Sequence, residues 1–188
     1  KDPYVTTGPS LTHYFGLGGV VNIPASLSIT EIGQYAFSNF DYIPKGPDDE
    51  ISEDSPETTK IWFIGDNTIE EVIIPEGVKT IGPYAFANLT ALKRVVLPST
   101  LERIDQGAFY GCTSLKLVEG LGSVKFINRN AFADCALEGS IKLDSVVALA
   151  DYAFFGNASL KSVTLSAATQ SVGAYAFSGC ASLTAVQI

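Results

Sequence analysis

The sequence predicts a mainly β solenoid, a right-handed coil with a parallel β-ribbon and short 3₁₀ corners. Its first support is the dipeptide Ala-Phe, which occurs six times, with the Phe at positions 37, 86, 109, 132, 154 and 177. The last four gaps are 22 or 23 residues long. The copies also contain a triplet that alternates apolar, variable and apolar residues, which is the periodicity of a strand; the fourth copy, Val118-Glu119-Gly120, is weaker. Because so short a segment cannot bury its apolar face alone, the copies must stack.

Stacking of these copies predicts about six coils of 23 residues in a single domain spanning 1–188. Within each coil we expect a short parallel strand, a turn, a second short extended piece and a compact corner. The strand triplets begin at Val21, Val72, Val95, Val118, Ile141, Val163 and Val186. Residues 1–19 precede the first triplet, and we expect them to form an N-terminal cap.

Two columns of the repeat predict tight corners. The residue two after each Phe is always Gly, Asn or Asp, the types that tolerate a left-handed backbone: Asn39, Asn88, Gly111, Asp134, Gly156 and Gly179. We therefore expect a positive φ at this position in every coil. The residue four before each Phe predicts a second such corner, with Ala150 as the exception: Gly33, Gly82, Asp105, Asn128, Ala150 and Gly173.

An acidic insertion, residues 41–66, enlarges the first repeat. Residues 41–60 hold seven acidic side chains against two lysines, so they contribute −5 of the formal net charge of −8. Acidic residues and three prolines predict a mobile loop, whereas residues 61–64 predict a short extra strand. The insertion is either a tolerated surface excursion or part of a partner site, with Tyr42, Trp62 and Phe63 as aromatic anchors. A calcium site is disfavoured, because Asp48, Asp49 and Glu50 lack the alternate spacing of an EF-hand loop.

The outward side chains of the strand triplets form a second candidate site. This column changes character along the array, through Asn22, Ile73, Val96, Glu119, Lys142, Thr164 and Gln187. Solenoids bind partners on such ribbons, and Ile73 beside Val96 predicts a mild apolar patch. Ile73, Val96, Glu119 and Lys142 are therefore candidate partner-binding residues; the alternative is a solvated sheet surface.

Catalytic, metal and cofactor sites are not expected. Cys112, Cys135 and Cys180 share one column, three residues after the Phe, which predicts core positions, with a disulfide between Cys112 and Cys135 as the alternative. CxxC spacing is absent, and His13, the single histidine, lies far away in sequence, so zinc is not expected. The acidic balance argues against nucleic acid, and no apolar run reaches the roughly 18 residues of a membrane helix.

The repeat resembles a known family. Residues 81–86, Ile-Gly-Pro-Tyr-Ala-Phe, and residues 111–115, Gly-Cys-Thr-Ser-Leu, are similar to the BspA-type leucine-rich repeat of bacterial surface antigens. Residues 11–19 resemble the opening coil of such arrays. Val118-Glu119-Gly120-Leu121 departs from the pattern because no Pro follows the strand, so the fourth coil should be the least regular.

The resemblance implies a leucine-rich repeat solenoid on a cell surface or in a secreted protein. It further implies a non-enzymatic module, expected to be a monomer, that recognises a protein or glycan through its strand ribbon and possibly the insertion. The alternative is a structural spacer or display segment of a larger surface protein. No cofactor is implied.

Overall fold

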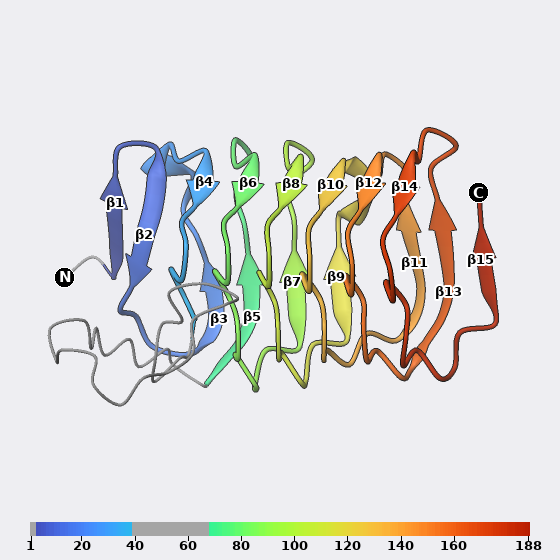
Figure 1. Cartoon of the computed structure of the whole chain (residues 1–188). Coiled ribbons are helices and arrows are strands. Elements are labelled where there is room, and N and C mark those ends of the chain that lie inside the picture. Colours follow the sequence, from blue (N-terminus) through green and yellow to red (C-terminus); the bar gives the residue numbers. More distant parts are fainter. Residues whose placement is uncertain (1–2, 39–67) are drawn as a thin grey trace, which may run out of the picture.

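A computed structural model of the chain describes residues 3–38 and 68–188. These residues form an elongated solenoid in which successive coils stack along one axis (Figure 1). One side is an eight-stranded sheet in the order β1-β2-β4-β6-β8-β10-β12-β14. The other side, called the ribbon below, consists of a sheet β3-β5-β7-β9 and a sheet β11-β13-β15. The core lies between the two sides.

The ribbon strands are the longer ones, and they coincide with the predicted triplets. They are β3 (Gly19–Asn22), β5 (Ile69–Ile73), β7 (Arg94–Val96), β9 (Leu117–Glu119), β11 (Gly139–Leu143), β13 (Leu160–Leu165) and β15 (Ala185–Gln187). All pairings within the two ribbon sheets are parallel. The residues that begin each triplet mostly point inward, which follows from the two-residue alternation of a strand.

The second extended piece of each coil forms the opposite side. Its strands are β4 (Glu31–Ile32), β6 (Thr80–Ile81), β8 (Arg103–Ile104), β10 (Phe126–Ile127), β12 (Ala148–Leu149) and β14 (Ser171–Val172). At the N-terminal end, β1 (Tyr4–Thr7) and β2 (Ser10–Tyr14) form an antiparallel hairpin that joins this sheet through β4. Among the described residues, short 3₁₀ helices follow ribbon strands at Ala25–Leu27 and Leu121–Ser123.

The repeated Phe forms a ladder through the core. Neighbouring rings of Phe37, Phe86, Phe109, Phe132, Phe154 and Phe177 are stacked with centroids 4.8 to 5.6 Å apart. Tyr14 extends the ladder at the N-terminal end, 4.9 Å from Phe37. Four of the rings are fully buried, at Phe86, Phe109, Phe132 and Phe154. The spacing matches the separation of strands in a sheet, so the ladder reports one common register for all coils.

Positive φ follows the first predicted corner column but not the second. Asn88, Gly111, Asp134, Gly156 and Gly179 all have φ between 56° and 78°, as expected; Asn39 lies outside the described residues. The prediction for the column four before the Phe is wrong. The second left-handed column is two residues before the Phe, at Tyr35, Tyr84, Gly107, Asn130, Tyr152 and Tyr175, with φ between 53° and 61°.

The glycines four before the Phe are explained by crowding instead, whereas Asp105, Asn128 and Ala150 hold the same position with a side chain. The N–H of Gly82 donates to Ile32 O of the preceding coil at 2.7 Å. A Cβ on Gly82 would lie 2.9 Å from that same oxygen, and a Cβ on Gly33 would lie 2.9 Å from Leu11 O. The two backbones therefore approach so closely that little room remains for a side chain. Sequence composition alone does not distinguish this close approach from a left-handed corner.

The cysteine column provides donors to the ladder. All three thiols are free and buried, which confirms the core interpretation. Each Sγ–H donates to the carbonyl of the Phe in the preceding coil: Cys112 to Phe86, Cys135 to Phe109 and Cys180 to Phe154, at 3.1 to 3.3 Å.

Asn157 occupies the same column in the coil of Phe154 and is fully buried. Its Nδ2 donates to Phe132 O at 2.8 Å and to Phe154 O at 2.9 Å. Its Oδ1 accepts the N–H of Leu137 at 3.0 Å. This third contact has no counterpart at the cysteines, so Asn157 supports an irregular stretch of the preceding coil.

The ribbon is interrupted after β9, where the missing Pro predicted irregularity. Gly120, with φ 90°, leads into the 3₁₀ turn Leu121–Ser123. Later in the same coil the buried Leu137 lies five residues after Phe132, whereas Leu115 lies six residues after Phe109. The chain then enters β11 through a bulge at Gly139, with φ 71°. As a result β11 contacts the 3₁₀ turn and pairs with β13, not with β9.

Candidate functional site

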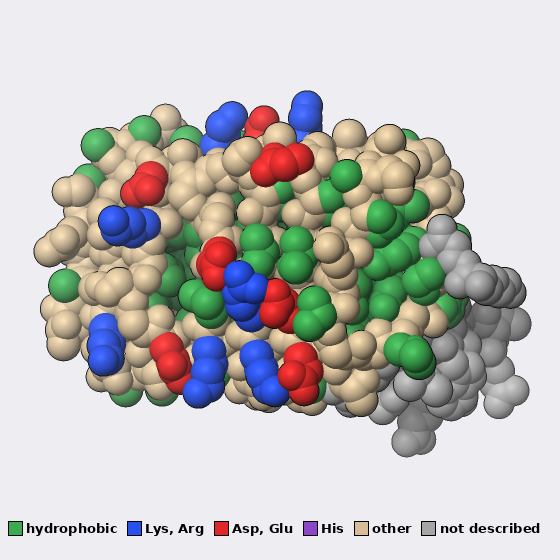
Figure 2. All heavy atoms as spheres, turned by 180° about the vertical axis from the view of Figure 1, so that it is seen from behind, with side chains coloured by type: hydrophobic (Ala, Val, Ile, Leu, Met, Phe, Trp, Pro, Cys, Tyr) green, Lys and Arg blue, Asp and Glu red, His purple; other side chains and the backbone are tan. Residues whose placement is uncertain are grey.

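The outward face of β3-β5-β7-β9 carries two rows of side chains. The strand register places Val20, Glu71, Arg94 and Leu117 in the first row, and Asn22, Ile73, Val96 and Glu119 in the second. The inward column between the rows is Val21, Val72, Val95 and Val118. The inward column contains only valine, whereas the residue types of the two outward rows change from coil to coil. This side of the molecule is drawn in Figure 2.

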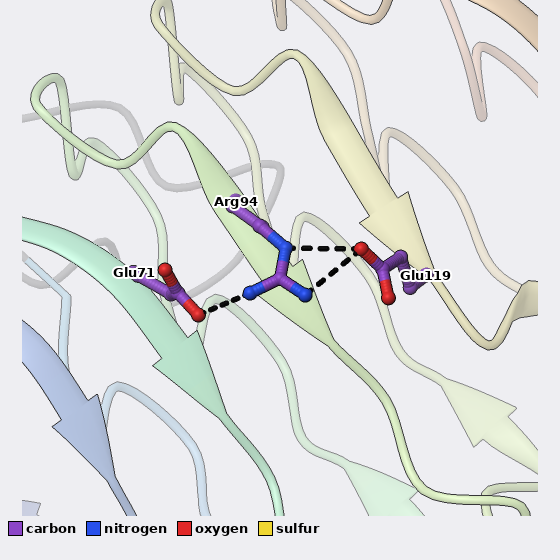
Figure 3. A network of polar contacts seen from close by, with 3 residues as sticks. All are labelled: Glu71, Arg94 and Glu119. Carbon is purple, nitrogen blue, oxygen red and sulfur yellow. Dashed lines mark hydrogen bonds and ion pairs between the residues drawn. The ribbon is translucent and has the colours of Figure 1, made fainter.

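A charged triplet lies at the centre of this face (Figure 3). The Arg94 guanidinium bridges two carboxylates from neighbouring strands. Its Nε and Nη2 donate to Glu119 Oε1 at 3.0 and 2.9 Å, and its Nη1 contacts Glu71 Oε1. The hydrogen bond to Glu119, followed by the nearby charges of both glutamates, raises the pKa of Arg94. These groups are part-exposed, so the triplet contributes little stability and mainly fixes the orientation of three side chains.

Further ion pairs line one border of the face. Lys93 pairs with Glu70 at 3.0 Å, and Lys116 pairs with Glu138 at 2.8 Å. In Figure 2 the charged side chains follow each other along this border. All four side chains are more than half exposed. The border is therefore polar and hydrated, as the rim of an interaction surface is.

Apolar side chains occupy the rest of the face. Ile73 and Val96 are half-buried neighbours in the second row. Val20 of the first row is 64% exposed and Leu117 is 48% exposed. Figure 2 shows hydrophobic side chains between the charged groups and gathered toward the N-terminal end. At that end Phe15 and Leu17, in the link between β2 and β3, are 68% and 88% exposed.

The residues predicted from the sequence fall into three groups. Ile73, Val96 and Glu119 lie side by side in the second row. Lys142 is exposed on β11, where it pairs with Thr164 of the other ribbon sheet. The expectation of one continuous outward column is therefore wrong at β9 and β11, because the irregular fourth coil divides the ribbon. Tyr42, Trp62 and Phe63, with the predicted strand 61–64, lie outside the described residues.

Sequence reasoning missed half of the surface. The first row lies two residues before the second, so the same alternation that identified Ile73 and Val96 would have identified Val20 and Leu117. Phe15 and Leu17 belong to no repeat column, and their exposure carries no sequence signal. The Arg94 triplet was also missed, since it joins a direct cross-strand neighbour, Glu71, to a diagonal one, Glu119.

The three thiols of the described residues are not poised for nucleophilic chemistry. Burial raises the pKa of the Cys112 thiol to about 12, and burial also raises the pKa of Cys135 and Cys180. These thiols are therefore protonated donors at neutral pH, not nucleophiles. Within 3–38 and 68–188, no three His, Cys, Asp or Glu side chains are grouped to hold a metal ion. The same residues include no helix long and apolar enough to cross a bilayer.

Comparison with known proteins identifies the repeat. The chain matches the BspA type leucine rich repeat region in six copies, over residues 15–138 and 57–184. The chain belongs to the BspA-type leucine-rich repeat family. Leucine-rich repeat solenoids of this kind are protein-interaction or display modules of bacterial surface proteins and are generally non-catalytic. No curated protein matches the chain.

Several solved structures of leucine-rich repeat proteins are similar to the chain. A T. pallidum leucine-rich repeat protein is 26% identical with a TM-score of 0.78, and the match covers 98% of this chain and 78% of that one. A leucine-rich cell surface protein of Faecalibacterium prausnitzii A2-165 is 25% identical with a TM-score of 0.61, covering 97% and 54%. A leucine-rich repeat protein of Bacteroides ovatus ATCC 8483, 22% identical with a TM-score of 0.50, covers 89% and 48% and shows the fold alone. The chain spans about half the length of the latter two.

Proposed function

We propose that this BspA-type solenoid is a non-enzymatic recognition module, exposed at a cell surface or secreted, that binds a protein or glycan through the outward face of β3-β5-β7-β9. The observation that carries the proposal is the make-up of that face. Two rows of varied side chains combine part-exposed apolar groups with an oriented Arg94 triplet and a charged border. Interfaces combine an apolar centre with a polar rim in this way.

The geometry also favours a fixed binding surface. Each strand of the face is held on both sides by parallel pairing or, for β3 and β9, on one side, and its inward valines pack on the Phe ladder. A rigid surface loses little conformational entropy when a partner binds. Two carboxylates already orient the Arg94 guanidinium. Apolar or aromatic groups of a partner can stack on its planar surface, and polar groups meet a fixed pattern of charges.

A binding screen tests the proposal with a matched pair of variants. The probes are extracellular-matrix proteins and a glycan array. Ile73→Glu/Val96→Glu adds two charges to the second row, and we expect it to weaken any binding by tenfold or more, since buried charge opposes association. Thr80→Glu/Ala148→Glu adds the same charges to outward positions of the eight-stranded sheet and should leave binding unchanged. Equal losses in both variants, or none in either, would contradict the assignment of the face.

Two further parts of the proposal need their own measurements. Deleting residues 44–58 tests whether the insertion, with Tyr42, Trp62 and Phe63, takes part; unchanged affinity would make it a bystander. Analytical ultracentrifugation tests the expected monomer. The second candidate is a spacer or display module. It is favoured by the elongated shape of the solenoid, whose coils stack along one axis. A stable monomer that binds none of the probes would support the spacer over recognition.

A further inference from the structure

The backbone of β9 has an unpaired edge in the middle of the solenoid. Toward β7, the N–H of Leu97 donates to Glu119 O at 2.9 Å. Backbone groups of successive residues in a strand point to alternate sides, so the N–H and C=O of Val118 and the N–H of Gly120 point away from β7. In the preceding coil the same groups of Val95 and Leu97 pair with β9. Within the part of the chain that the structure describes, nothing supplies a partner for these three groups of β9.

The strand β11 turns a matching edge toward β9. Ser140 and Lys142 occupy the positions that Leu117 and Glu119 have in the coil before, so their backbone groups point toward β9. Among the described residues, the C=O of Ser140 and both backbone groups of Lys142 also have no partner. Most Cα–Cα distances between β9 and β11 exceed 8 Å, whereas nearly all those between β7 and β9 are shorter. The two unpaired edges, residues 118–120 and 140–142, are called the ribbon break below.

The ribbon break is short and lies on one side of the solenoid. Before it, the N–H of Glu138 donates to Lys116 O at 3.2 Å, so the neighbouring coils are still joined there. After it, β11 contacts the 3₁₀ turn Leu121–Ser123. On the opposite side, β10 and β12 pair in parallel within the eight-stranded sheet (Figure 1). The two coils are therefore held together while their ribbon edges stay unpaired.

Side chains beside the ribbon break define what fits there. Val118 belongs to the inward column but is part-exposed, whereas Val95, at the same position one coil earlier, is fully buried. Leu117, directly before Val118, is 48% exposed on the outward side. The next outward side chains, Glu119 on one edge and Lys142 on the other, are both exposed and carry opposite charges. An apolar inward residue, an apolar outward residue before it and a polar outward residue after it complement these edges.

We propose that the ribbon break is a docking site for an extended segment of a partner protein, which adds as one strand parallel to β9 and β11. A strand between two others separates them by about 9 to 10 Å. Its inward residue donates to Ser140 O and accepts from the N–H of Lys142, and the outward residues on either side accept from the N–H groups of Val118 and Gly120. Extended peptides bind unpaired sheet edges in this way. The proposal goes beyond recognition through the outward face, because it depends on backbone groups and stands even if the side chains of that face bind nothing.

A designed peptide tests the proposal on the full chain. The acetylated and amidated octapeptide Ser-Lys-Leu-Val-Thr-Val-Ser-Lys places its Leu beside Leu117, its first Val inward and its Thr between Glu119 and Lys142. Amide hydrogen exchange of the isotope-labelled chain is measured by NMR with and without the peptide at millimolar concentration. Without the peptide, the amides of Val118, Gly120 and Lys142 should exchange as rapidly as unpaired amides do. With the peptide, their exchange should slow by about tenfold or more.

Two matched comparisons separate backbone pairing from side-chain contact. A peptide N-methylated at its first Val keeps the side chains but lacks the donor to Ser140 O, and it should give no protection. Lys142→Pro removes an N–H that has no partner among the described residues, and it should abolish the protection of Val118 and Gly120. Lys142→Ala removes the same side chain but keeps that N–H, so most of the protection should remain. If Lys142→Pro does not fold, the N-methylated peptide makes the same comparison on the unaltered chain.

Three results would overturn the proposal. One is equal exchange of the three amides with and without the peptide. Another is equal protection by the N-methylated peptide, or a loss with Lys142→Ala as complete as with Lys142→Pro, because side chains would then account for binding. The third is slow exchange without any peptide. A dependence on protein concentration would then assign the ribbon break to a second copy of the chain, and faster exchange after deletion of residues 41–66 would assign it to the insertion.

Discussion

Asn157 offers the sharpest test of how the coils are held together. Besides a long contact of 3.4 Å to Phe155 O, its fully buried side chain makes three shorter hydrogen bonds, and replacing it by Ala removes those to Phe132 O, Phe154 O and the N–H of Leu137. Phe154 O keeps the thiol of Cys180 as a donor, whereas the other two groups stay buried and unpaired. At about 1 kcal/mol net for each bond, the free energy of unfolding should fall by about 3 kcal/mol.

Asn157→Cys separates the two roles of that side chain. Cysteine restores the donor to Phe132 O, as Cys112 and Cys135 donate in their own coils, but it cannot accept from Leu137. The expected loss is about 2 kcal/mol, between the parent and Asn157→Ala. Asn22→Leu, on the exposed face of β3, is the control and should change stability by less than about 0.5 kcal/mol.

Urea unfolding followed by far-UV circular dichroism measures these differences. The order of stability should be parent, then Asn157→Cys, then Asn157→Ala. If Asn157→Ala stays within about 0.5 kcal/mol of the parent, the three contacts do not hold the irregular coil. If Asn157→Cys is as unstable as Asn157→Ala, the thiols of this column are not functional donors.

Three further predictions concern the ladder, the thiols and the backbone approach. Phe109→Ala should cost about 3 to 5 kcal/mol in urea unfolding, and Phe177→Ala, at the partly buried end, clearly less; equal costs would contradict the ladder. Burial raises the pKa of Cys112 from 9.0 to about 12, so stability present below pH 9 should decline between pH 9 and 12, as the unfolded thiol ionises first. Unfolding curves measured at several pH values check that the free energy of unfolding falls as pH rises. If Cys112→Ala loses as much stability over this range, the Cys112 thiol is not the cause of the loss. Gly82→Ala should destabilise by about 1 to 3 kcal/mol, because its Cβ would crowd Ile32 O, and a neutral result would contradict that crowding.

The fold followed from the sequence because repetition multiplies a weak local signal. One Ala-Phe pair predicts nothing, but five pairs spaced 22 or 23 residues apart, with a sixth beyond the insertion, predict the coil length, the inward column and the stacking. The positive φ two residues after each Phe was also readable, since Asn88, Asp134 and the glycines share a single backbone property. The sequence also departs from the pattern in the irregular fourth coil, but the missing Pro is not specific to it, because Asp144 and Ser166 follow later strands.

Features that depend on contacts between coils were not readable. Position 82 holds a glycine because the carbonyl oxygen of Ile32 is close. A left-handed turn also favours glycine, so the residue type alone does not separate the two causes. Tyr84 and Tyr152 have positive φ although tyrosine disfavours it, so residue type indicated the wrong column. Half of the candidate face was predicted, because Ile73 and Val96 follow strand alternation. The diagonal reach of Arg94 to Glu119 depends on side-chain length and strand register together.

The most direct test of the account is the contact between successive Phe rings in solution. With Phe selectively labelled, a nuclear Overhauser spectrum should show ring-to-ring contacts linking Phe86 to Phe109 and Phe109 to Phe132, whose centroids are 5.1 Å apart. No contact should link Phe86 directly to Phe132. Rings that contact unrelated residues, or a missing link in this central run, would contradict the common register from which both proposed surfaces derive.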